Sequence, residues 1–422
     1  MHSLHGLHLL LAGLLLLSHS QSVEASDVTS NQTYTAFSQS NISSYQLAPG
    51  NANFAFRLYH LIASQNSRQN IFFSPLSISF SLAMLSAGAG GDTRTQILEG
   101  LGFNLTELSL PEIHEGFRLL QHRLSRQSPQ LSINVGNVLV LSRDLQLLPN
   151  FISATKTSYD SKVLRSNFRD MEATTQLINN YVKEKTQGKI RDLVSGLSPN
   201  EKMIMVNYIF FQGLWKKPFP PLKVSVSDFY VDENTVVKVP MMVQDDQEHW
   251  YLDDRRVPCT VLRMDYKEDA RAFFILPQKG KMEEVEQVLS PGMLARWNQL
   301  LQKRYFYRKL SLKFPKFSIS NSYPLDEILP DLGFHDLFTH HANFSNINQD
   351  EKLHLSKVFH KAVLDVNEVG TEAAASTGVS VMFFSAKHKK RVLIFNQPFF
   401  AVIYSTSTQN ILFMGKVFNP TA

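Results

Sequence analysis

The sequence predicts an α+β fold, and two observations support this: the order of the secondary-structure patterns and the size of the apolar fraction. Segments with the spacing of helices dominate up to Glu184, and from Met203 onward β-branched, aromatic or alternating segments prevail. Helices first and strands later favour α+β over a doubly wound parallel sheet. With 43% hydrophobic and 11% aromatic residues, the chain has ample material for a large core.

The helical segments are those in which apolar residues recur at every third or fourth position. They cover Ala52–Ala63, Leu76–Ala87, Thr95–Leu101, Ile113–Leu124, Phe151–Tyr159 and Ala173–Glu184. The strand segments are short and either rich in β-branched and aromatic residues or alternating. They cover Met203–Phe211, Val237–Met242, Val257–Met264, Ala272–Leu276, Leu310–Ile319, Phe359–Val366, Val392–Phe395, Phe399–Ser405 and Ile411–Val417.

The N-terminus resembles a secretory signal peptide over residues 1–20. Its apolar run from Leu7 to Leu17 is too short to span a membrane, and it ends at the small-x-small pattern Ser18-His19-Ser20. Histidines stand where such peptides carry Lys or Arg before the apolar run. Because no later segment is apolar for the length of a membrane span, we expect a secreted, extracellular protein without one.

A polar segment over residues 21–50 precedes a long stretch, 51–420, that contains no linker. Length alone would favour two or three domains, but without a composition shift we expect one large domain. The single cysteine, Cys259, cannot form an internal disulfide, so the core alone must stabilise this domain. Asn-x-Ser/Thr acceptors fit an extracellular surface and predict glycosylation at Asn31, Asn41, Asn104 and Asn343.

The segment from Glu368 to Ser385 has the pattern of a strand, although its side chains are too small for a permanent core. From Thr371 to Val381 alternate positions are small or β-branched and uncharged, as in a strand with one buried face. The segment includes Gly370 and is followed by the basic run Lys387–Arg391. Without further information, the simplest interpretation is a flexible, Ala-rich surface loop.

The string Glu-x-Gly-Thr-Glu-Ala-Ala at residues 368–374 resembles the reactive-loop hinge of inhibitory serpins. Motifs over about nine-tenths of the chain resemble those of that family in the family's order. They lie at 70–78, 88–97, 206–219, 239–242, 274–277, 314–317, 332–333, 360–362, 395–399 and 413–420. Gln212 and Asn346 depart from the residues that are common in the family. The resemblance implies the serpin fold, a single domain with three β-sheets, about nine helices and an exposed reactive loop at about 368–391.

In inhibitory serpins the target protease cleaves the exposed loop, which then inserts as a new strand into a preformed sheet. The resemblance implies a hinge formed by Gly370, Thr371, Glu372, Ala373, Ala374 and Ala375. It also implies a hydrogen-bonding cluster beneath the central sheet, at the point where two strands must separate to admit the loop; its members are Ser74, Ser77, Asn207 and His360. It implies a second group at the end of the sheet where the loop enters; its members are Trp215, Lys316 and Glu368.

The specific expectation at the top of the opening is an ion pair between Lys316 and Glu368. As an ordinary surface pair it would be worth about 0–1 kcal/mol. Without the resemblance, His360 would be interpreted as a hydrogen-bonded core histidine.

The resemblance also locates the reactive bond. In the inhibitory family the attacked carbonyl usually belongs to the residue fourteen after the hinge glycine, which is Phe384, so the bond is Phe384–Ser385. An aromatic side chain fills the specificity pocket of chymotrypsin-like proteases, whereas a trypsin-like pocket has a buried Asp that a phenyl ring leaves unpaired. The Phe-Phe-Ser string resembles the bait that one serpin presents to tissue kallikrein. We therefore expect a tissue-kallikrein-like or chymotrypsin-like target; the next candidate bond is Phe383–Phe384.

A short basic cluster predicts binding of heparin or a related glycosaminoglycan. Four cations interrupted by aromatic residues lie between a predicted helix and a strand, in a region that related serpins use for the polyanion. They are Lys303, Arg304, Arg308 and Lys309. A solvated helix end is the alternative. The rival patches are Arg118, His122, Arg123 and Arg126, diluted by Glu112 and Glu115, and the run Lys387–Arg391.

The sequence has no catalytic or metal-binding motif that would favour an enzyme over a protease inhibitor. The sequence has no Gly-x-Ser-x-Gly and no His-Glu-x-x-His, and Gly88–Thr93 lacks the ending of a phosphate-binding loop. The adjacent His340 and His341 have no acidic or thiol partner at a useful spacing. We expect a monomer that is not an enzyme and has no metal, cofactor or nucleic-acid partner.

The remaining alternative is a non-inhibitory serpin-fold carrier or storage protein. Insertion must bury alternate hinge side chains, so a charge or a proline there would prevent it. Thr371, Ala373, Ala375 and Thr377 are neither charged nor proline. The hinge therefore favours an inhibitor.

Overall fold

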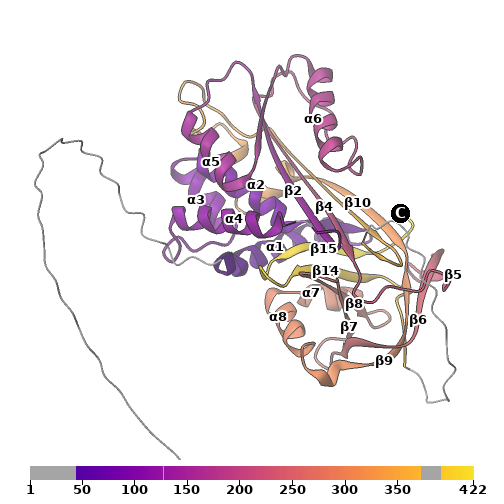
Figure 1. The fold of residues 1–422 in the computed structure, drawn as a ribbon. Helices are drawn as coiled ribbons and strands as arrows, with labels where there is room; N and C mark the ends of the chain where they lie inside the picture. Colours follow the sequence, from indigo (N-terminus) through magenta and orange to yellow (C-terminus); the bar gives the residue numbers. More distant parts are fainter. Residues whose placement is uncertain (1–43, 127, 372–390) are drawn as a thin grey trace, which may run out of the picture. The chain divides into compact units, whose positions relative to one another are not determined.

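A six-stranded sheet contains the start of the predicted hinge. The computed structural model describes residues 44–126, 128–371 and 391–422. In this sheet the strands follow the order β10-β11-β12-β4-β2-β3 (Figure 1). Their bounds are β2 (Leu131–Ser142), β3 (Lys162–Ser166), β4 (Met203–Leu214), β10 (Phe317–Pro324), β11 (Lys357–Val366) and β12 (Gly370–Thr371).

The other strands form a nine-stranded network in the order β1-β15-β14-β8-β7-β6-β9-β13, with β5 also joined to β6. Long strand β6 pairs with β5 and β9 over most of its length and with β7 from Trp250 onward. The described strands therefore form two hydrogen-bonded sheets where the resemblance implies three, because β6 pairs with both β7 and β9 and joins them into one network. The bounds are β1 (Ile71–Phe73), β5 (Val224–Tyr230), β6 (Val236–Asp253), β7 (Cys259–Asp265), β8 (Ala270–Pro277), β9 (Tyr307–Pro315), β13 (Val392–Ile394), β14 (Phe399–Ser405) and β15 (Ile411–Val417).

Nine α-helices occur in the described part of the chain, and α2 to α5 group beside strands β2 and β4 (Figure 1). They are α1 (Ala48–Gln65), α2 (Pro75–Gly88), α3 (Gly91–Gly100), α4 (Leu110–Leu124), α5 (Pro149–Tyr159), α6 (Met171–Lys185), α7 (Met282–Val288), α8 (Pro291–Leu300) and α9 (Leu325–Ile328). Short 3₁₀ turns are η1 (Ser44–Leu47), η2 (Arg304–Phe306), η3 (Leu329–Leu332) and η4 (Asp336–Phe338).

Helix α2 is the central helix of the core. Ser74 caps it by accepting a hydrogen bond from the Ser77 N–H, and Pro75 occupies the first helical position. The helix is apolar or small around its circumference, and it packs against β2 and β4 on one side and β15 on the other. Ile178 and Val182 of α6 pack with residues of β2 and β4 in a separate apolar cluster.

The structure corrects some predicted elements. The single strand predicted over Leu310–Ile319 is wrong, because the chain passes from β9 to β10 at Pro315 and so changes sheet. Strands β2, β3 and β5 and helix α7 were not predicted, and helix α8 was expected only as a helix without bounds before the basic cluster. Helix α1 begins at Ala48, just before the predicted start of the domain at residue 51.

All described residues belong to one compact unit, Asn41–Ala422. The predicted signal peptide and the polar segment up to residue 43 lie outside the described residues. Among the residues that the structure describes, no helix combines the length and the apolar character needed to cross a bilayer.

Candidate functional site

Gly370 and Thr371 form a two-residue strand between β11 and β4 at one end of the six-stranded sheet. Thr371 lies opposite Val366 of β11 and Gly213 of β4, antiparallel to both. At the other end β11 and β4 pair directly and in parallel, over Lys357–Ala362 of β11. The two strands are therefore separated where β12 lies and joined beyond it.

The turn that leads from β11 into β12 requires its glycine. A Cβ atom on residue 370 would lie 2.0 Å from the carbonyl oxygen of Gly213, which is closer than side chains allow. The Asn367 side chain closes the turn, because its Oδ1 accepts hydrogen bonds from the N–H groups of Val369 and Gly370 at 3.0 and 3.1 Å. Sequence reasoning missed Asn367.

His360 and Asn207 lie opposite one another where β11 and β4 are joined. His360 Nε2 is 3.2 Å from the backbone N of Ser74, and His360 Nδ1 is 2.5 Å from Asn207 Oδ1. A backbone N–H only donates, so Nε2 must accept, and Nδ1 carries the proton that is donated to Asn207. The neutral imidazole thus connects the start of α2 to both strands of the junction.

Ser77 completes the predicted cluster. Its Oγ donates to Asn207 Oδ1 at 2.8 Å, and Asn207 Nδ2 donates to the Ser77 carbonyl oxygen at 2.9 Å. Asn207 Nδ2 also donates to Asn137 Oδ1 at 2.7 Å, and the Ser81 Oγ donates to the same oxygen at 2.5 Å. The structure therefore brings Ser74, Ser77, Asn207 and His360 together, all fully buried.

Asn137 and Ser81 are members of this cluster that sequence reasoning missed. The available signals were an amide within the otherwise apolar run Val135–Leu141 and a serine one helical turn after Ser77. Buried polar groups that are fully hydrogen-bonded specify one arrangement, and separating β4 from β11 would break the His360–Asn207 bond, which crosses the junction, at about 1 kcal/mol net. The cluster can therefore hold the junction closed.

Burial of histidines makes stability dependent on pH. Burial lowers the pKa of His360 to about 3. Burial, followed by a neighbouring Arg94 or Lys217 cation, lowers the pKa values of His114 and His249 to about 4. The folded state therefore favours neutral rings, so stability is complete above the ordinary pKa near 6.5 and declines as pH falls towards the folded values.

We expect acidification from pH 7 to pH 5 to cost on the order of 2 kcal/mol of unfolding free energy for each of these histidines. The His360→Gln variant should lack the contribution of His360 to this loss. Its unfolding free energy should therefore fall less than that of the wild type between pH 7 and pH 5. Denaturant unfolding at each pH measures this. His354→Gln, at an exposed position, is the control and should behave like the wild type. Equal pH dependence in His360→Gln would contradict the prediction.

Trp215 contacts the turn between β11 and β12, at the end of the sheet where β12 separates β11 from β4. Its backbone N–H donates to the Val369 carbonyl oxygen at 2.9 Å, and its indole Nε1 donates to the Asn367 carbonyl oxygen at 3.1 Å. The indole stacks on Tyr266 with 4.3 Å between ring centres, and the Tyr266 hydroxyl lies 2.7 Å from Thr371 Oγ1. Thr371 is fully buried. Tyr266, which nothing in the sequence singled out, thus anchors the first residues of the hinge.

The expected ion pair between Lys316 and Glu368 is present. The Lys316 Nζ lies 3.2 Å from Glu368 Oε2, and the side chains are 46% and 17% exposed. The Glu368 carbonyl oxygen also accepts from the Phe219 N–H at 2.8 Å. At this exposure the pair contributes about 0–1 kcal/mol, so its main effect is to orient the segment that leads into the hinge.

Several predicted residues lie outside the described residues. They are Glu372, Ala373, Ala374 and Ala375 of the hinge, the bond Phe384–Ser385, and the acceptors Asn31 and Asn41. The acceptors Asn104 and Asn343 are both exposed.

The predicted basic cluster lies on η2 and the start of β9, where two of its members face acids. Arg304 Nη2 lies 3.3 Å from Glu248, and Lys309 Nζ lies 3.8 Å from Asp246. Lys303 is exposed and has no ion-pair partner among the described residues. The cluster retains an excess of positive charge.

Aromatic rings support the arginines of the cluster. The Arg304 guanidinium lies 4.6 Å from the ring centre of Tyr307. The Arg308 guanidinium lies 4.5 Å from that of Tyr251 and 5.5 Å from that of Tyr305. Such stacking orders the two guanidinium groups. The N–H groups of Arg304 also donate to Glu248 and to the Tyr307 carbonyl oxygen, so an anion at Arg304 would compete with these partners.

Two arginines of the rival patch on α4 also have partners. Arg118 donates to both carboxylate oxygens of Glu115, at 2.7 and 2.6 Å, and Arg123 donates to the Ser407 carbonyl oxygen at 2.9 Å. In the run Lys387–Arg391 only Arg391 is described, and it pairs with Asp253 at 2.7 Å.

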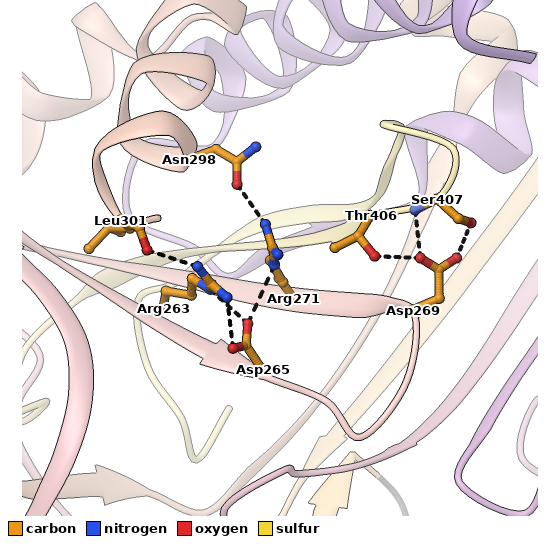
Figure 2. A network of polar contacts seen from close by, with 8 residues as sticks. All are labelled: Arg263, Asp265, Asp269, Arg271, Asn298, Leu301, Thr406 and Ser407. Atoms are coloured by element: carbon orange, nitrogen blue, oxygen red, sulfur yellow. Dashed lines mark hydrogen bonds and ion pairs between the residues drawn. The ribbon is translucent and has the colours of Figure 1, made fainter. Parts of the chain in front are cut away.

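A polar network joins Arg263 and Asp265 of β7, Arg271 of β8 and Asn298 of α8 (Figure 2). Arg263 donates to both oxygens of Asp265, at 2.7 and 2.8 Å, and to the Leu301 carbonyl oxygen at 2.8 Å. Arg271 Nη1 donates to Asn298 Oδ1 at 3.1 Å. Arg271 and Asn298 also line a cavity of about 570 Å³, bounded by α1, α8 and the turn between β14 and β15.

The chain belongs to the serpin family, because the family model described as Serpin (serine protease inhibitor) matches residues 49–420. It is 55% identical to kallistatin of Pongo abelii and 54% identical to kallistatin of Homo sapiens, over 100% of each chain. Corticosteroid-binding globulin of Homo sapiens is 46% identical over 89% of this chain and 90% of that protein.

Solved structures agree with this assignment. The structure of human glycosylated kallistatin has a TM-score of 0.85 and 56% identity, covering 89% of this chain and 98% of that one. Cleaved kallistatin complexed with heparin has a TM-score of 0.76 and 57% identity, covering 78% and 96%. Human thyroxine-binding globulin complexed with thyroxine has a TM-score of 0.84 and 40% identity, covering 90% and 100%.

Proposed function

We propose that this protein is a secreted inhibitor that traps tissue-kallikrein-like or chymotrypsin-like serine proteases as a suicide substrate cleaved at Phe384–Ser385. The observation that carries the proposal is the position of Gly370–Thr371 between β11 and β4. A strand that continues from Thr371 between them would run antiparallel to both. It would replace one parallel pairing by two antiparallel pairings, which are slightly more stable per residue.

The energy available for insertion is large. About fourteen inserted residues, at about 1 kcal/mol net for each ladder hydrogen bond, correspond to on the order of 10 kcal/mol. Before cleavage the protein is therefore kinetically trapped. The buried hydrogen bond between His360 and Asn207 contributes to the barrier, because it must break as β11 and β4 separate.

Insertion accounts for inhibition. The protease attacks the Phe384 carbonyl carbon, forms its acyl-enzyme there and releases the chain that begins at Ser385. When the freed segment enters the sheet, the acylated protease moves with it. Hydrolysis of the acyl bond requires the protease's catalytic groups to be aligned with that bond. Displacement of these groups therefore leaves the acyl bond intact.

A mixture of the protein with chymotrypsin tests the proposal. We expect a complex that survives boiling in detergent, together with a released C-terminal peptide that begins at Ser385 in mass spectrometry. Chymotrypsin inactivated at its active-site serine cannot form the acyl bond and is the control. Complete cleavage without a stable complex would contradict the proposal, and a peptide with another first residue would relocate the bond.

The basic cluster supports heparin binding, in keeping with the similarity to kallistatin, which has been solved with heparin. Replacing Lys303, Arg304, Arg308 and Lys309 by Gln should lower heparin affinity and reduce the slope of log affinity against log salt by about three to four. Heparin chromatography and titration at several salt concentrations measure this. Arg118→Gln is the control. Unchanged retention of the fourfold variant would place the site elsewhere.

A small-molecule carrier is the second candidate, and the cavity of about 570 Å³ beside α8 favours it. Two similar proteins are named for such ligands, corticosteroid-binding globulin and thyroxine-binding globulin. The cavity combines the Tyr45 and Tyr404 rings with polar groups of Arg271 and Asn298. Saturable binding of thyroxine or a corticosteroid, without any complex with chymotrypsin, would favour the carrier.

A further inference from the structure

A second pocket lies beside the predicted heparin cluster and is not part of it. It has a volume of about 180 Å³, room for one small anionic group, and its lining includes Lys216, Lys217, Trp250, Arg263 and Tyr307. Lys216 and Lys217 come from the segment that follows β4, and Trp250 and Tyr307 from the cross-strand pair of β6 and β9. We call it the Lys217 pocket.

The Tyr307 ring joins the Lys217 pocket to the heparin cluster. The Lys217 Nζ lies 4.8 Å from the ring centre and 2.5 Å from the phenol oxygen. The Arg304 guanidinium carbon lies 4.6 Å from the same ring centre. A cation of the predicted cluster and a cation of the pocket therefore share one aromatic platform, so the two sites form a continuous surface.

The two acidic residues that line the Lys217 pocket already form ion pairs with arginines. Both oxygens of Asp265 accept from Arg263, whose side chain is only 8% exposed, and Glu248 pairs with Arg304. Lys216 and Lys217 are exposed, and neither forms an ion pair with any residue that the structure describes. The two lysines therefore leave the pocket with a net positive charge.

The buried side chain of His249 also indicates a positive electrostatic potential in the Lys217 pocket. His249 lines the pocket at 6% exposure, and its Nε2 has no hydrogen-bond partner among the described residues. After burial, the Lys217 cation is the second cause that lowers the pKa of His249. A neutral His249 adds no charge, so the attraction for an anion comes from the lysines.

We propose that the Lys217 pocket binds a sulfate group of a sulfated glycosaminoglycan, so that the polyanion surface extends from the heparin cluster across Tyr307 to Lys216 and Lys217. Lys217 Nζ already donates to the Glu248 carbonyl oxygen at 2.8 Å and to the Tyr307 hydroxyl at 2.5 Å, which leaves it one N–H. That N–H and the Lys216 ammonium would donate to the sulfate oxygens, and the Trp250 and Tyr307 rings would contact the adjoining sugar. This inference rests on the proposed heparin binding.

The test compares heparin binding of a Lys216→Gln/Lys217→Gln variant with that of the wild type at several salt concentrations. We expect about tenfold weaker binding at physiological salt and a slope of log affinity against log salt that is smaller by up to about two. Lys217→Arg should retain most of the affinity, because it keeps the charge. Lys238→Gln is the matched control, since Lys238 is an exposed lysine that pairs with Asp228 on the β5–β6 hairpin.

Each outcome has a distinct meaning. Suppose that the double variant has the melting temperature and the heparin affinity of the wild type, whereas the fourfold variant of the heparin cluster does not bind. The proposed role of the Lys217 pocket is then overturned, and the proposed heparin function stands. If Lys238→Gln loses as much affinity as the double variant, the effect is one of net charge and the pocket is again overturned. A wild-type protein that does not bind heparin overturns both proposals.

Discussion

Cleavage of the reactive loop should raise the thermal unfolding midpoint by more than about 10 °C, because the inserted strand adds on the order of 10 kcal/mol. The physical basis is the separation of β11 and β4 around Gly370–Thr371 and the uncharged alternate face that follows. Calorimetry of the intact and the protease-nicked protein measures the shift. An unchanged midpoint would contradict insertion and favour the carrier.

A single charge at the hinge should abolish both this shift and the inhibition. Thr371 is already buried between β11 and β4, against Tyr266, before cleavage. An unpaired charge there would cost several kcal/mol, so Thr371→Arg should keep the first hinge residue out of the sheet and block the entry of the residues that follow. The variant should be cleaved by chymotrypsin at the normal rate but form no stable complex. Glu372→Arg is the matched control, because the alternation in the sequence predicts that an inserted residue 372 faces solvent, and it should still trap the protease. Trapping by Thr371→Arg would refute the role of the hinge.

Phe384→Arg should reverse the choice of protease. We expect inhibition of chymotrypsin to fall by about 100-fold or more and inhibition of trypsin-like enzymes to rise, because the arginine pairs with the buried Asp of their specificity pocket. Association rate constants with both enzymes measure the change. Phe383→Arg, one residue earlier, is the control and should keep the preference for chymotrypsin. If Phe383→Arg causes the reversal instead, the reactive bond is Phe383–Phe384.

Local patterns in the sequence were sufficient for the fold class, because the spacing of apolar residues belongs to single segments. The helix predicted over Leu76–Ala87 lies within α2, and the string from Glu368 to Ala374 identified the hinge through its resemblance to inhibitory serpins. The family resemblance then predicted the cluster of Ser74, Ser77, Asn207 and His360, and the structure brings these side chains within hydrogen-bonding distance.

The α+β class and a hinge free of proline, with uncharged residues at its alternate positions, followed from the sequence alone, since these properties belong to single segments. Only the tertiary structure decided that Asn137 bonds to Asn207, that Tyr266 meets Thr371, and that Tyr307 joins Lys217 to Arg304. Each of these contacts joins distant parts of the chain through strand register or close approach in the fold. No local pattern encodes which residue will lie opposite another, because the register is set by the packing of whole strands against the shared core.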